Sequence, residues 1–334
     1  MMRCLQSSYN TAVSVTPLAE ILAAEIRAGG PIPFSRYMRT ALYHPEHGYY
    51  RRQHDPFGKA GDFYTAEQLQ PAFGLLMREY VRGLRENLGA PDGFTLVEMG
   101  AGREEMGVFF REFGYIPVDV DRGALPRRFQ GVLFANEFFD ALPVDVAVRR
   151  GAGYREMRVD CRDGAFCWSE GEAVDAQATG HLAKYGGDAQ EGDLRELNFD
   201  MLRSLDEIAR SMEGGYLLVI DYGYTTRELV RFPQGTLMSY QRHTASEDVL
   251  CDPGSRDITA HVDFSALEAH TAMHGFKKVR FEPLALALMR AGEKDNFAAV
   301  LEGADEAQRL RARLQLKTLL YGMGETFWTL LLAR

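Results

Sequence analysis

The sequence predicts an α/β protein built on a Rossmann-like, mostly parallel sheet with helices on both faces. Three observations predict this fold class. First, four short apolar runs are continuous rather than alternating, as in strands buried on both faces: 94–99, 115–120, 131–136 and 214–221. Second, helical patterns separate these runs. Third, a glycine-rich turn follows the first run, where ligands of such sheets bind.

The remaining elements follow from periodicity. Before the first run, apolar residues recur at helical spacing, and Pro17 marks a helix start. The predicted helices are 17–28, 35–42, 68–88, 103–113, 194–212, 264–274 and 304–320. Two more strands are predicted at 276–281 and 326–332, and we expect the last to be antiparallel. A helix, a strand, a helix and a last strand would complete one large sheet.

Two segments lie outside this alternation and suggest a domain division. Residues 146–170 have period-two stretches around Asp163-Gly164, which predict an inserted β-hairpin. Residues 222–262 are polar and rich in Gly, Pro and His, a candidate lid or substrate loop. We therefore divide the chain into three parts: an N-terminal helical cap (1–93), a core (94–145 and 192–334) and an inserted hairpin or substrate region (146–191).

Composition excludes several classes of protein. The chain has 334 residues, 46% of them hydrophobic, and a net charge of −9, so a large core forms without metal or disulfide staples. An acidic surface without a basic stripe disfavours nucleic acid as the partner. The four cysteines lack zinc-ligand spacing and are expected to be free thiols. We find neither a secretory signal nor a window of about 20 apolar residues, so we expect a cytoplasmic protein without a membrane span.

The turn after the first apolar run has the features of a nucleoside site. Glu98 ends the run, and Gly100 and Gly102 allow the backbone to approach a ligand closely at a helix start. Asp119 lies 17 residues beyond Gly102, placed to accept both ribose hydroxyls. Taken alone, such a turn is also compatible with a simple strand-to-helix connection.

The same turn favours a methyl donor over a dinucleotide. A dinucleotide fingerprint needs a third glycine three residues after Gly102, where this chain has Glu105. A carboxylate beside a pyrophosphate is unfavourable, whereas S-adenosylmethionine has no phosphate and carries a cationic sulfonium.

A second cluster of polar residues follows the third apolar run. Asn136, Glu137 and Asp140 lie among apolar neighbours at the carboxyl edge of the predicted sheet. Buried acids and amides are costly unless they are paired or used. We assign Asn136 to the cofactor and the two acids to catalysis; the alternative is a helix cap at Asn136 with solvated acids.

Three further motifs are candidates for the site. Gly61-Asp62-Phe63 precedes a helix and either folds over a ligand or caps the helix. His261 is a third candidate catalytic residue, since with Asp257 it would orient a nucleophile. His270 and His274 are one helical turn apart, which suits a metal, but no glutamate lies between them as in zinc proteases, and we predict no metal site.

Together these motifs resemble one family, the MidA-like S-adenosylmethionine-dependent methyltransferases, which include the mitochondrial complex I assembly arginine methyltransferase. The resemblance covers nearly the whole chain. It is carried by these segments: 30–38, 41–43, 48–50, 61–63, 98–103, 135–143, 220–223, 235–237, 257–264 and 323–327. The strings 136–143 and 257–264 are long and specific.

The resemblance implies a seven-stranded class I methyltransferase sheet and S-adenosyl-L-methionine as cofactor. The donor would lie over Gly100 and Gly102, held by Asp119, with the loop 61–63 closing on it. It also implies a protein substrate, with an arginine guanidinium as acceptor. Glu137 and Asp140 are the acids expected to orient this guanidinium.

The chain departs from the family pattern after Asp121. Only 122–130 precede the next run, where the family has room for a helix and a strand that wall the adenine pocket. Glu104 and Glu105 replace smaller residues, and Met238 stands where a basic residue is common. These departures motivate the alternative of an inactive family member that acts as a binding or assembly factor.

The sequence leaves other functions open. A nicotinamide oxidoreductase is disfavoured by the incomplete glycine fingerprint, and a small-molecule methyltransferase is compatible with the loop regions. The acceptor's identity and the number of methyl groups are not encoded in any motif. The final strand and the inserted hairpin are both candidate surfaces for a homodimer.

Overall fold

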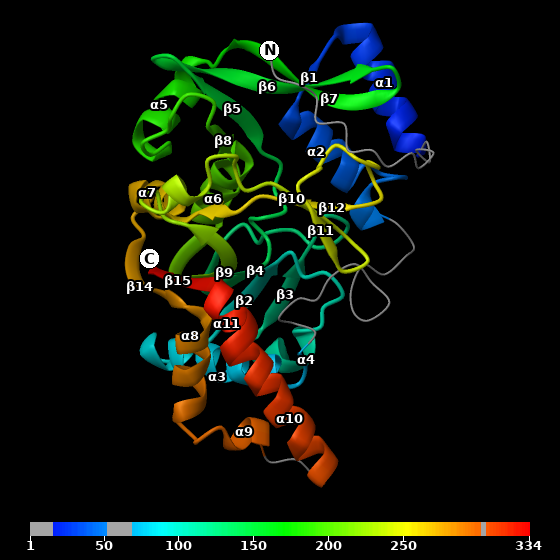
Figure 1. Cartoon of the computed structure of the whole chain (residues 1–334). Helices are drawn as coiled ribbons and strands as arrows, with labels where there is room; N and C mark the ends of the chain where they lie inside the picture. Colours follow the sequence, from blue (N-terminus) through cyan, green and yellow to red (C-terminus); the bar gives the residue numbers. More distant parts are fainter. Residues whose placement is uncertain (1–15, 52–68, 302–304) are drawn as a thin grey trace.

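The computed structural model describes residues 16–51, 69–301 and 305–334. Its central sheet has the strand order β14-β15-β9-β4-β2-β3, and the short strand β13 (Val262–Asp263) pairs with β9 as the seventh (Figure 1). β3, β2, β4 and β9 are mutually parallel, while β15 is antiparallel to both β9 and β14. The strand bounds are β2 Thr95–Met99, β3 Tyr115–Val118, β4 Phe129–Asn136, β9 Met212–Tyr224, β14 Lys277–Pro283 and β15 Phe327–Ala333. The predicted fold class is confirmed, including the antiparallel last strand.

Burial on both faces explains why these strands are continuously apolar. Val132 and Phe134 of β4 belong to one hydrophobic core, whereas Leu133 and Ala135 belong to the core on the opposite face. All four side chains are fully buried. Successive residues of a strand point to opposite faces, so each face needs its own apolar set.

Helices cover the two faces. One core contains residues of α3 (Ala72–Asn87), α4 (Gly107–Phe110), α8 (Leu284–Glu293), α9 (Ala298–Leu301) and α10 (Glu306–Thr318). The other core contains residues of α6 (Phe199–Ser211) and α7 (Phe264–Met273). The remaining short helical segments are η1 Tyr49–Arg51, η3 Arg111–Phe113, η4 Leu229–Arg231, the π-helix η5 Leu319–Met323 and α11 Gly324–Thr326.

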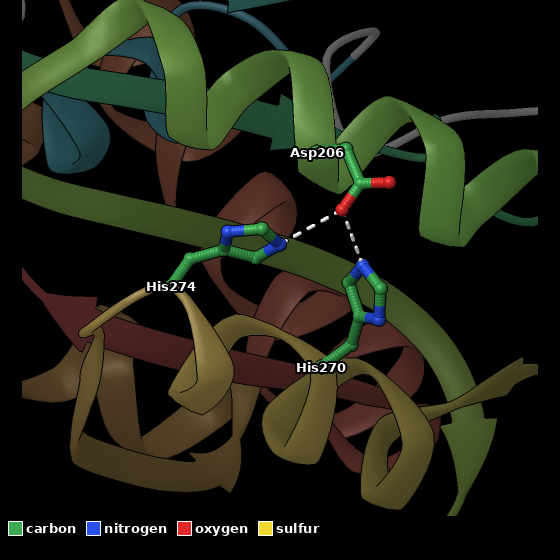
Figure 2. A group of neighbouring side chains, drawn as sticks. All are labelled: Asp206, His270 and His274. Carbon is green, nitrogen blue, oxygen red and sulfur yellow. Dashed lines mark hydrogen bonds and ion pairs between the residues drawn. The ribbon is translucent and has the colours of Figure 1, made fainter.

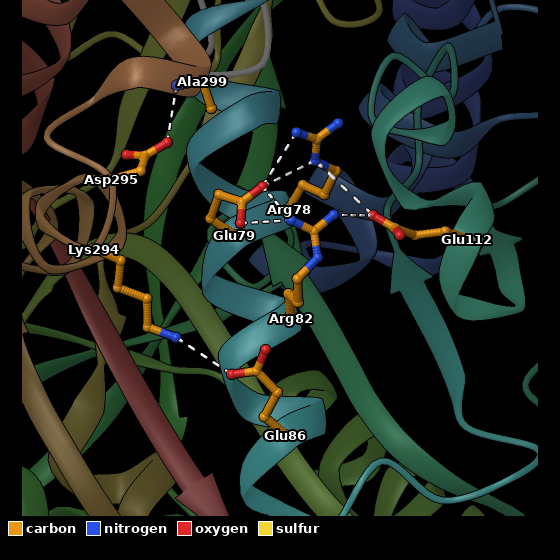
Figure 3. Close-up of polar contacts among 8 residues, drawn as sticks. All are labelled: Arg78, Glu79, Arg82, Glu86, Glu112, Lys294, Asp295 and Ala299. Atoms are coloured by element: carbon orange, nitrogen blue, oxygen red, sulfur yellow. Dashed lines mark hydrogen bonds and ion pairs between the residues drawn. The ribbon is translucent and has the colours of Figure 1, made fainter.

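The outer side of α3 carries a charged network (Figure 3). Glu79 accepts hydrogen bonds from Arg78 and from Arg82, whose guanidinium also donates to Glu112 at 2.7 Å. Glu112 belongs to η3, so the network joins α3 to the segment before β3. Asp295 caps the start of α9 by accepting from the Ala299 N–H at 2.8 Å. Such pairs keep the helix polar on its exposed side and contribute little stability individually.

A second, antiparallel sheet has the order β1-β6-β5-β8, with β7 paired to β6. One part of this sheet packs against α1 (Pro17–Gly29) and α2 (Phe34–Tyr43). Another part of the sheet packs against α5 (Ala176–Tyr185) (Figure 1). Its strands are β1 Ile32–Pro33, β5 Asp145–Arg150, β6 Gly153–Arg162, β7 Ala165–Ala173 and β8 Leu194–Leu197. The predicted hairpin is β6–β7, and its two turn residues, Asp163 and Gly164, have φ values of 50° and 79°, as a two-residue hairpin turn requires.

A third sheet, β11-β10-β12, lies between the other two in Figure 1. Its strands are β10 Met238–Gln241, β11 Thr244–Ser246 and β12 Asp257–Thr259. The segment 222–262, predicted as one long loop, therefore contains ordered strands as well as the end of β9. The backbone N–H of Ala260 donates to the carbonyl of Asp140 at 2.9 Å, which ties this sheet to the loop after β4.

Two predicted helices differ from the structure. The helix predicted at 194–212 begins only at Phe199, because 194–197 pairs with β5 as strand β8 and Asn198 caps the helix by accepting from the Met201 N–H. The helix predicted at 103–113 is reduced to α4 and η3, since Glu104 adopts a positive φ of 58° that interrupts helical geometry.

The domain division at residue 93 stays a prediction. Within the predicted cap, α1 and α2 pack on the second sheet, whereas α3 packs in a core of the central sheet. In the described part of the chain, no disulfide bond involves Cys161, Cys167 or Cys251. No helix among the described residues has the length and apolarity needed to cross a bilayer.

Candidate active site

A cleft of about 1710 Å³ opens at the carboxyl ends of the parallel strands β2, β3, β4 and β9. Open α/β sheets bind their ligands at this edge, because the loops that follow the strands converge there. Residues of the central sheet, the third sheet, α2 and α6 line the cleft. Of the sequence-predicted site residues, the cleft is lined by Gly100, Gly102, Asp119, Asn136, Glu137, Asp140 and His261.

The glycine turn after β2 is shaped by backbone contacts to β3. Gly100 and Gly102 have φ values of 72° and 48°, in the left-handed region that favours glycine. The N–H of Gly100 donates to the Val118 carbonyl at 2.9 Å, and a Cβ at Gly100 would lie 3.1 Å from the Phe138 ring. The N–H of Gly102 donates to a carboxylate oxygen of Asp119 at 2.7 Å. This turn therefore holds the predicted ribose acid directly beside the predicted donor loop.

The short connection after Asp119 is tied to the same turn. Asp119 and Arg122 form an isolated antiparallel bridge, and β4 follows at Phe129 without another strand beyond β3. The guanidinium of Arg122 donates to the carbonyl of Gly102 and to the carboxylate of Glu104. Asp121 forms an ion pair with Arg51, which comes from the N-terminal segment. Glu104, which departs from the family pattern, thus pairs with a residue of the shortened connection.

Glu98 lies behind the glycine turn rather than in the cleft. Its side chain is buried, and Tyr115 donates a hydrogen bond to one carboxylate oxygen. The other oxygen makes no hydrogen bond within the described residues. Burial is the main cause that raises the pKa of Glu98, to about 8, and the nearby acids add to this rise. A direct contact between Glu98 and a cofactor stays a prediction.

The loop after β4 is held by a buried aspartate of β9. Asp221 is fully buried and accepts hydrogen bonds from the backbone N–H groups of Phe139, Asp140 and Tyr222 at 3.1, 3.3 and 2.9 Å. Glu137 has a positive φ of 49° and donates its N–H to the Ile220 carbonyl at 2.9 Å. A left-handed glutamate costs about 1 kcal/mol or more, which marks a functional loop.

Asp140 points into the cleft from this loop. It is buried, and the phenol of Tyr222 donates to one of its carboxylate oxygens, while the other makes no hydrogen bond within the described residues. Burial raises the pKa of Asp140 to about 6, and the hydrogen bond from Tyr222 opposes this rise. Burial also raises the pKa of Asp221, beside Asp140 and Glu137. At neutral pH Asp140 is mainly ionised and needs a cationic or hydrogen-bonding partner.

His261 lines the cleft from the short connection between β12 and β13. Its ring packs edge-on against the rings of Tyr222 and Phe232, with centroids 5.3 Å away in both cases. Burial lowers the pKa of His261 to about 4, so the imidazole is neutral at physiological pH. Asp257, its predicted partner, instead accepts a hydrogen bond from Tyr50 at 2.9 Å. The structure thus brings His261 to Tyr222, whose phenol donates to Asp140.

One predicted cofactor segment cannot be placed. Gly61, Asp62 and Phe63 lie outside the described residues. In the described part of the N-terminal segment, Tyr43 donates to the Ala141 carbonyl at 2.8 Å, and its ring lies 5.5 Å from that of Tyr50. Tyr43, Tyr49 and Tyr50 therefore form part of one wall of the cleft.

The chain matches known proteins in both sequence and fold. Residues 117–282 match the family model described as "Putative S-adenosyl-L-methionine-dependent methyltransferase". The crystal structure of a Burkholderia thailandensis protein bound to S-adenosyl-homocysteine superimposes with a TM-score of 0.85 at 30% identity, covering 95% of this chain and 92% of that one. The chain belongs to the MidA-like family of S-adenosylmethionine-dependent methyltransferases.

Curated members of this family are more distant in sequence. The Drosophila melanogaster protein named protein arginine methyltransferase NDUFAF7 homolog, mitochondrial, is 29% identical, with 74% of this chain and 68% of that protein covered. Human protein arginine methyltransferase NDUFAF7, mitochondrial, is 27% identical, covering 76% of this chain and 68% of that protein. The cofactor of the MidA-like chain is S-adenosyl-L-methionine, as the sequence predicted.

The residues of the cleft fit this cofactor. A small side chain is needed at Gly100 for a nucleoside to approach the backbone, and a Cβ there would instead face the Phe138 ring at 3.1 Å. Asp119 lies at the mouth of the turn and is half-buried, so its carboxylate has room for ribose hydroxyls. Asn136 is the last residue of β4, the neighbouring strand, and Glu137 follows it. These residues would hold the nucleoside and the amino-acid part of the donor on one edge of the sheet.

Sequence reasoning missed three residues of this arrangement: Tyr222, Asp221 and Arg122. Asp221 and Tyr222 lie at the end of a buried apolar run, as Glu98 and Asn136 do. This position at the end of a strand was the signal in the sequence that could have identified them. Arg122 was not detectable, because its role depends on the shortened connection folding back onto the glycine turn.

Proposed function

We propose that this protein transfers the methyl group of S-adenosylmethionine to the guanidinium of an arginine in a protein substrate. The observation that carries the proposal is the pair of acids, Glu137 and Asp140, on one rigid loop beside the predicted donor turn. The curated relatives named as protein arginine methyltransferases support the same acceptor.

The charge pattern of the cleft favours a cationic acceptor. Among the described residues, every arginine that lines the cleft is engaged by an acid of the chain: Arg39 and Arg203 by Asp200, Arg103 by Glu105, Arg122 by Glu104 and Arg231 by Glu228. Asp140, in contrast, makes no ion pair with a lysine or arginine in the described part of the chain. A guanidinium entering the cleft would supply the missing cation and could bridge two carboxylates through its planar N–H groups.

The donor supplies an electrophilic methyl on a sulfonium, which a nitrogen attacks in line. The chain's own contribution is then positioning and charge. Glu137 and Asp140 would orient the guanidinium, and an ionised carboxylate would accept the proton that the methylated nitrogen releases. Asp221 keeps the loop rigid through three backbone N–H groups, and neutral His261 adds no like charge beside the acceptor.

Methyl transfer from labelled S-adenosylmethionine tests this proposal. The substrates are arginine-bearing peptides and matched peptides with lysine in place of arginine, followed by acid hydrolysis and identification of the labelled amino acid. Label in methylarginine, lost with the lysine peptides, is the expected result. Glu137→Gln and Asp140→Asn should each lower transfer by on the order of 10²-fold, since each removes a charge from the orienting pair. Donor binding should be retained in both variants.

The alternative function, an inactive binding or assembly factor, rests on the shortened connection 122–130. It predicts that the folded protein transfers no label to any peptide or protein, whether or not it binds donor. Label in an amino acid other than arginine would instead keep the enzyme class and reject the arginine acceptor.

A further inference from the structure

We infer that the protein binds a divalent transition-metal ion, with Zn²⁺ as the best fit, at Asp206, His270 and His274. Asp206 lies in the middle of α6, His270 lies in the last turn of α7, and His274 is the C-cap residue that follows α7 (Figure 2). None of the three lines the cleft, so the site is separate from the methyl-transfer centre.

The three side chains converge on one point. The Nε2 atoms of His270 and His274 lie 2.7 and 2.8 Å from the same carboxylate oxygen of Asp206. All three ligand atoms lie within 4.8 Å of one another, and Figure 2 shows both rings turned towards the carboxylate. Tetrahedral zinc ligands stand about 3.3 Å apart, given metal–ligand bonds of about 2.0–2.1 Å. Each histidine nitrogen therefore lies only about half an ångström closer to the Asp206 oxygen than two ligands of such an ion would.

The spacing in the sequence adds to this geometry. Histidines at positions i and i+4 of a helix lie on one face one turn apart, which is the arrangement that binds zinc in other helices. The sequence alone left this pair without a third ligand. The structure supplies the third ligand from a different helix. This ligand is Asp206 of α6, which precedes His270 by 64 residues in the chain.

The local field also favours a cation. His270 and His274 lie at the carboxyl end of α7, where the last carbonyl groups of a helix carry partial negative charge. Asp206 adds a carboxylate that lies within hydrogen-bond distance of both imidazoles. Both imidazoles would bind through the Nε2 lone pair, with the ring proton on Nδ1.

The donor set selects the class of ion. Two imidazoles and one carboxylate suit zinc and its neighbours in the first transition row, and do not suit Ca²⁺ or Mg²⁺, which prefer all-oxygen sites. The three side chains are partly exposed, at 16%, 34% and 37% for His270, His274 and Asp206, so water can complete the coordination. A bound ion would fasten α6 to α7, two helices that pack together on one face of the central sheet.

Calorimetric titration of the metal-free full-length protein with ZnCl₂ tests the site. The variants are Asp206→Asn and His274→Ala, and the matched control is His47→Ala. His47 stacks on His44 with ring centroids 5.4 Å apart. The control substitution therefore removes one member of a different histidine pair. We expect one tight equivalent in the wild type and in the control. In the two site variants Zn²⁺ binding should weaken by more than the ~10–100-fold that loss of an outer-shell partner costs.

A second readout keeps the result independent of folding defects. Zn²⁺ should raise the melting temperature of the wild type and of His47→Ala, and should not raise that of the site variants. The spectrum of the wild type with Co²⁺ should show nitrogen and oxygen ligands without thiolate charge transfer. Binding of equal strength in wild type and site variants, a thiolate spectrum, or no stoichiometric binding in the wild type would each overturn the inference. None of these results depends on donor binding or methyl transfer.

Discussion

The hydrogen bond from Tyr222 to Asp140 leads to a sharp prediction about Tyr222→Phe. The substitution removes the phenol that donates to the buried carboxylate and leaves the ring in place. A hydrogen bond to a charged group contributes about 1.5–3 kcal/mol, against about 1 kcal/mol for a neutral pair. Because one pKa unit corresponds to about 1.4 kcal/mol, the pKa of Asp140 should rise by roughly one unit from its value of about 6.

The sign of the pH dependence follows from the folded-state pKa. The pKa of Asp140 is raised above the value of about 3.9 expected in the unfolded chain. A raised acid stabilises the folded state in its protonated form, and this contribution is lost as the pH rises through about 6. In Tyr222→Phe the ionised carboxylate of Asp140 is less well solvated, so the stability that is lost on raising the pH is larger. The variant should therefore be destabilised more at pH 8 than at pH 5, by about 1–2 kcal/mol.

Thermal melting at the two pH values measures this difference. A stability change of 1 kcal/mol shifts the melting temperature by roughly 2–4 °C in proteins of about 150–250 residues, and somewhat less in a longer chain. The control is Tyr43→Phe, which loses a buried hydrogen bond to the Ala141 carbonyl, a group that does not titrate. Its deficit should be the same at both pH values. An equal deficit for Tyr222→Phe at pH 5 and pH 8 would refute the assigned titration of Asp140.

Two further substitutions test the fold and the donor turn. Leu133→Ala should destabilise the protein by about 2–5 kcal/mol, because Leu133 is fully buried in β4. The control Leu314→Ala should change stability by less than about 0.5 kcal/mol, because Leu314 is 57% exposed. Equal melting temperatures of the two variants would contradict the assigned core. Arg122→Ala should weaken S-adenosylhomocysteine binding several-fold in calorimetry with little change in melting temperature, because Arg122 holds the shortened connection to the glycine turn. Arg128→Ala, which removes an exposed ion pair with Glu213, should leave binding unchanged, and an equal loss in both variants would reject the role of Arg122.

Much of the central sheet could be predicted because its strands are buried on both faces. Such strands are continuously apolar, so 94–99, 131–136 and 214–221 stand out without any alignment. The glycine turn could be predicted for a similar reason, since the positive φ angles at Gly100 and Gly102 favour glycine, whereas the role of Asp119 as the ribose acid stays a prediction. Local patterns of this kind depend on few neighbours.

The second and third sheets were harder to predict because their pairing is not local. Strand β8 has only four residues, and its partner β5 lies about 50 residues earlier, so the segment 194–197 was absorbed into the following helix. Asp221 and Asp206 were missed in the same way. Asp221 binds the backbone of residues some 80 positions earlier, and Asp206 meets its two histidines only because α6 and α7 pack together.

Binding of S-adenosylhomocysteine to the purified protein tests the central claim most directly. Titration calorimetry of the wild type, of Asp119→Ala and of Asp188→Ala as an exposed control gives the answer in one experiment. The account predicts a single site in the wild type and in the control. Loss of the carboxylate that would accept both ribose hydroxyls removes about 1.5–3 kcal/mol per hydrogen bond, or at least tenfold in affinity. A folded wild-type protein without measurable binding, or Asp119→Ala binding as tightly as the wild type, would contradict the account.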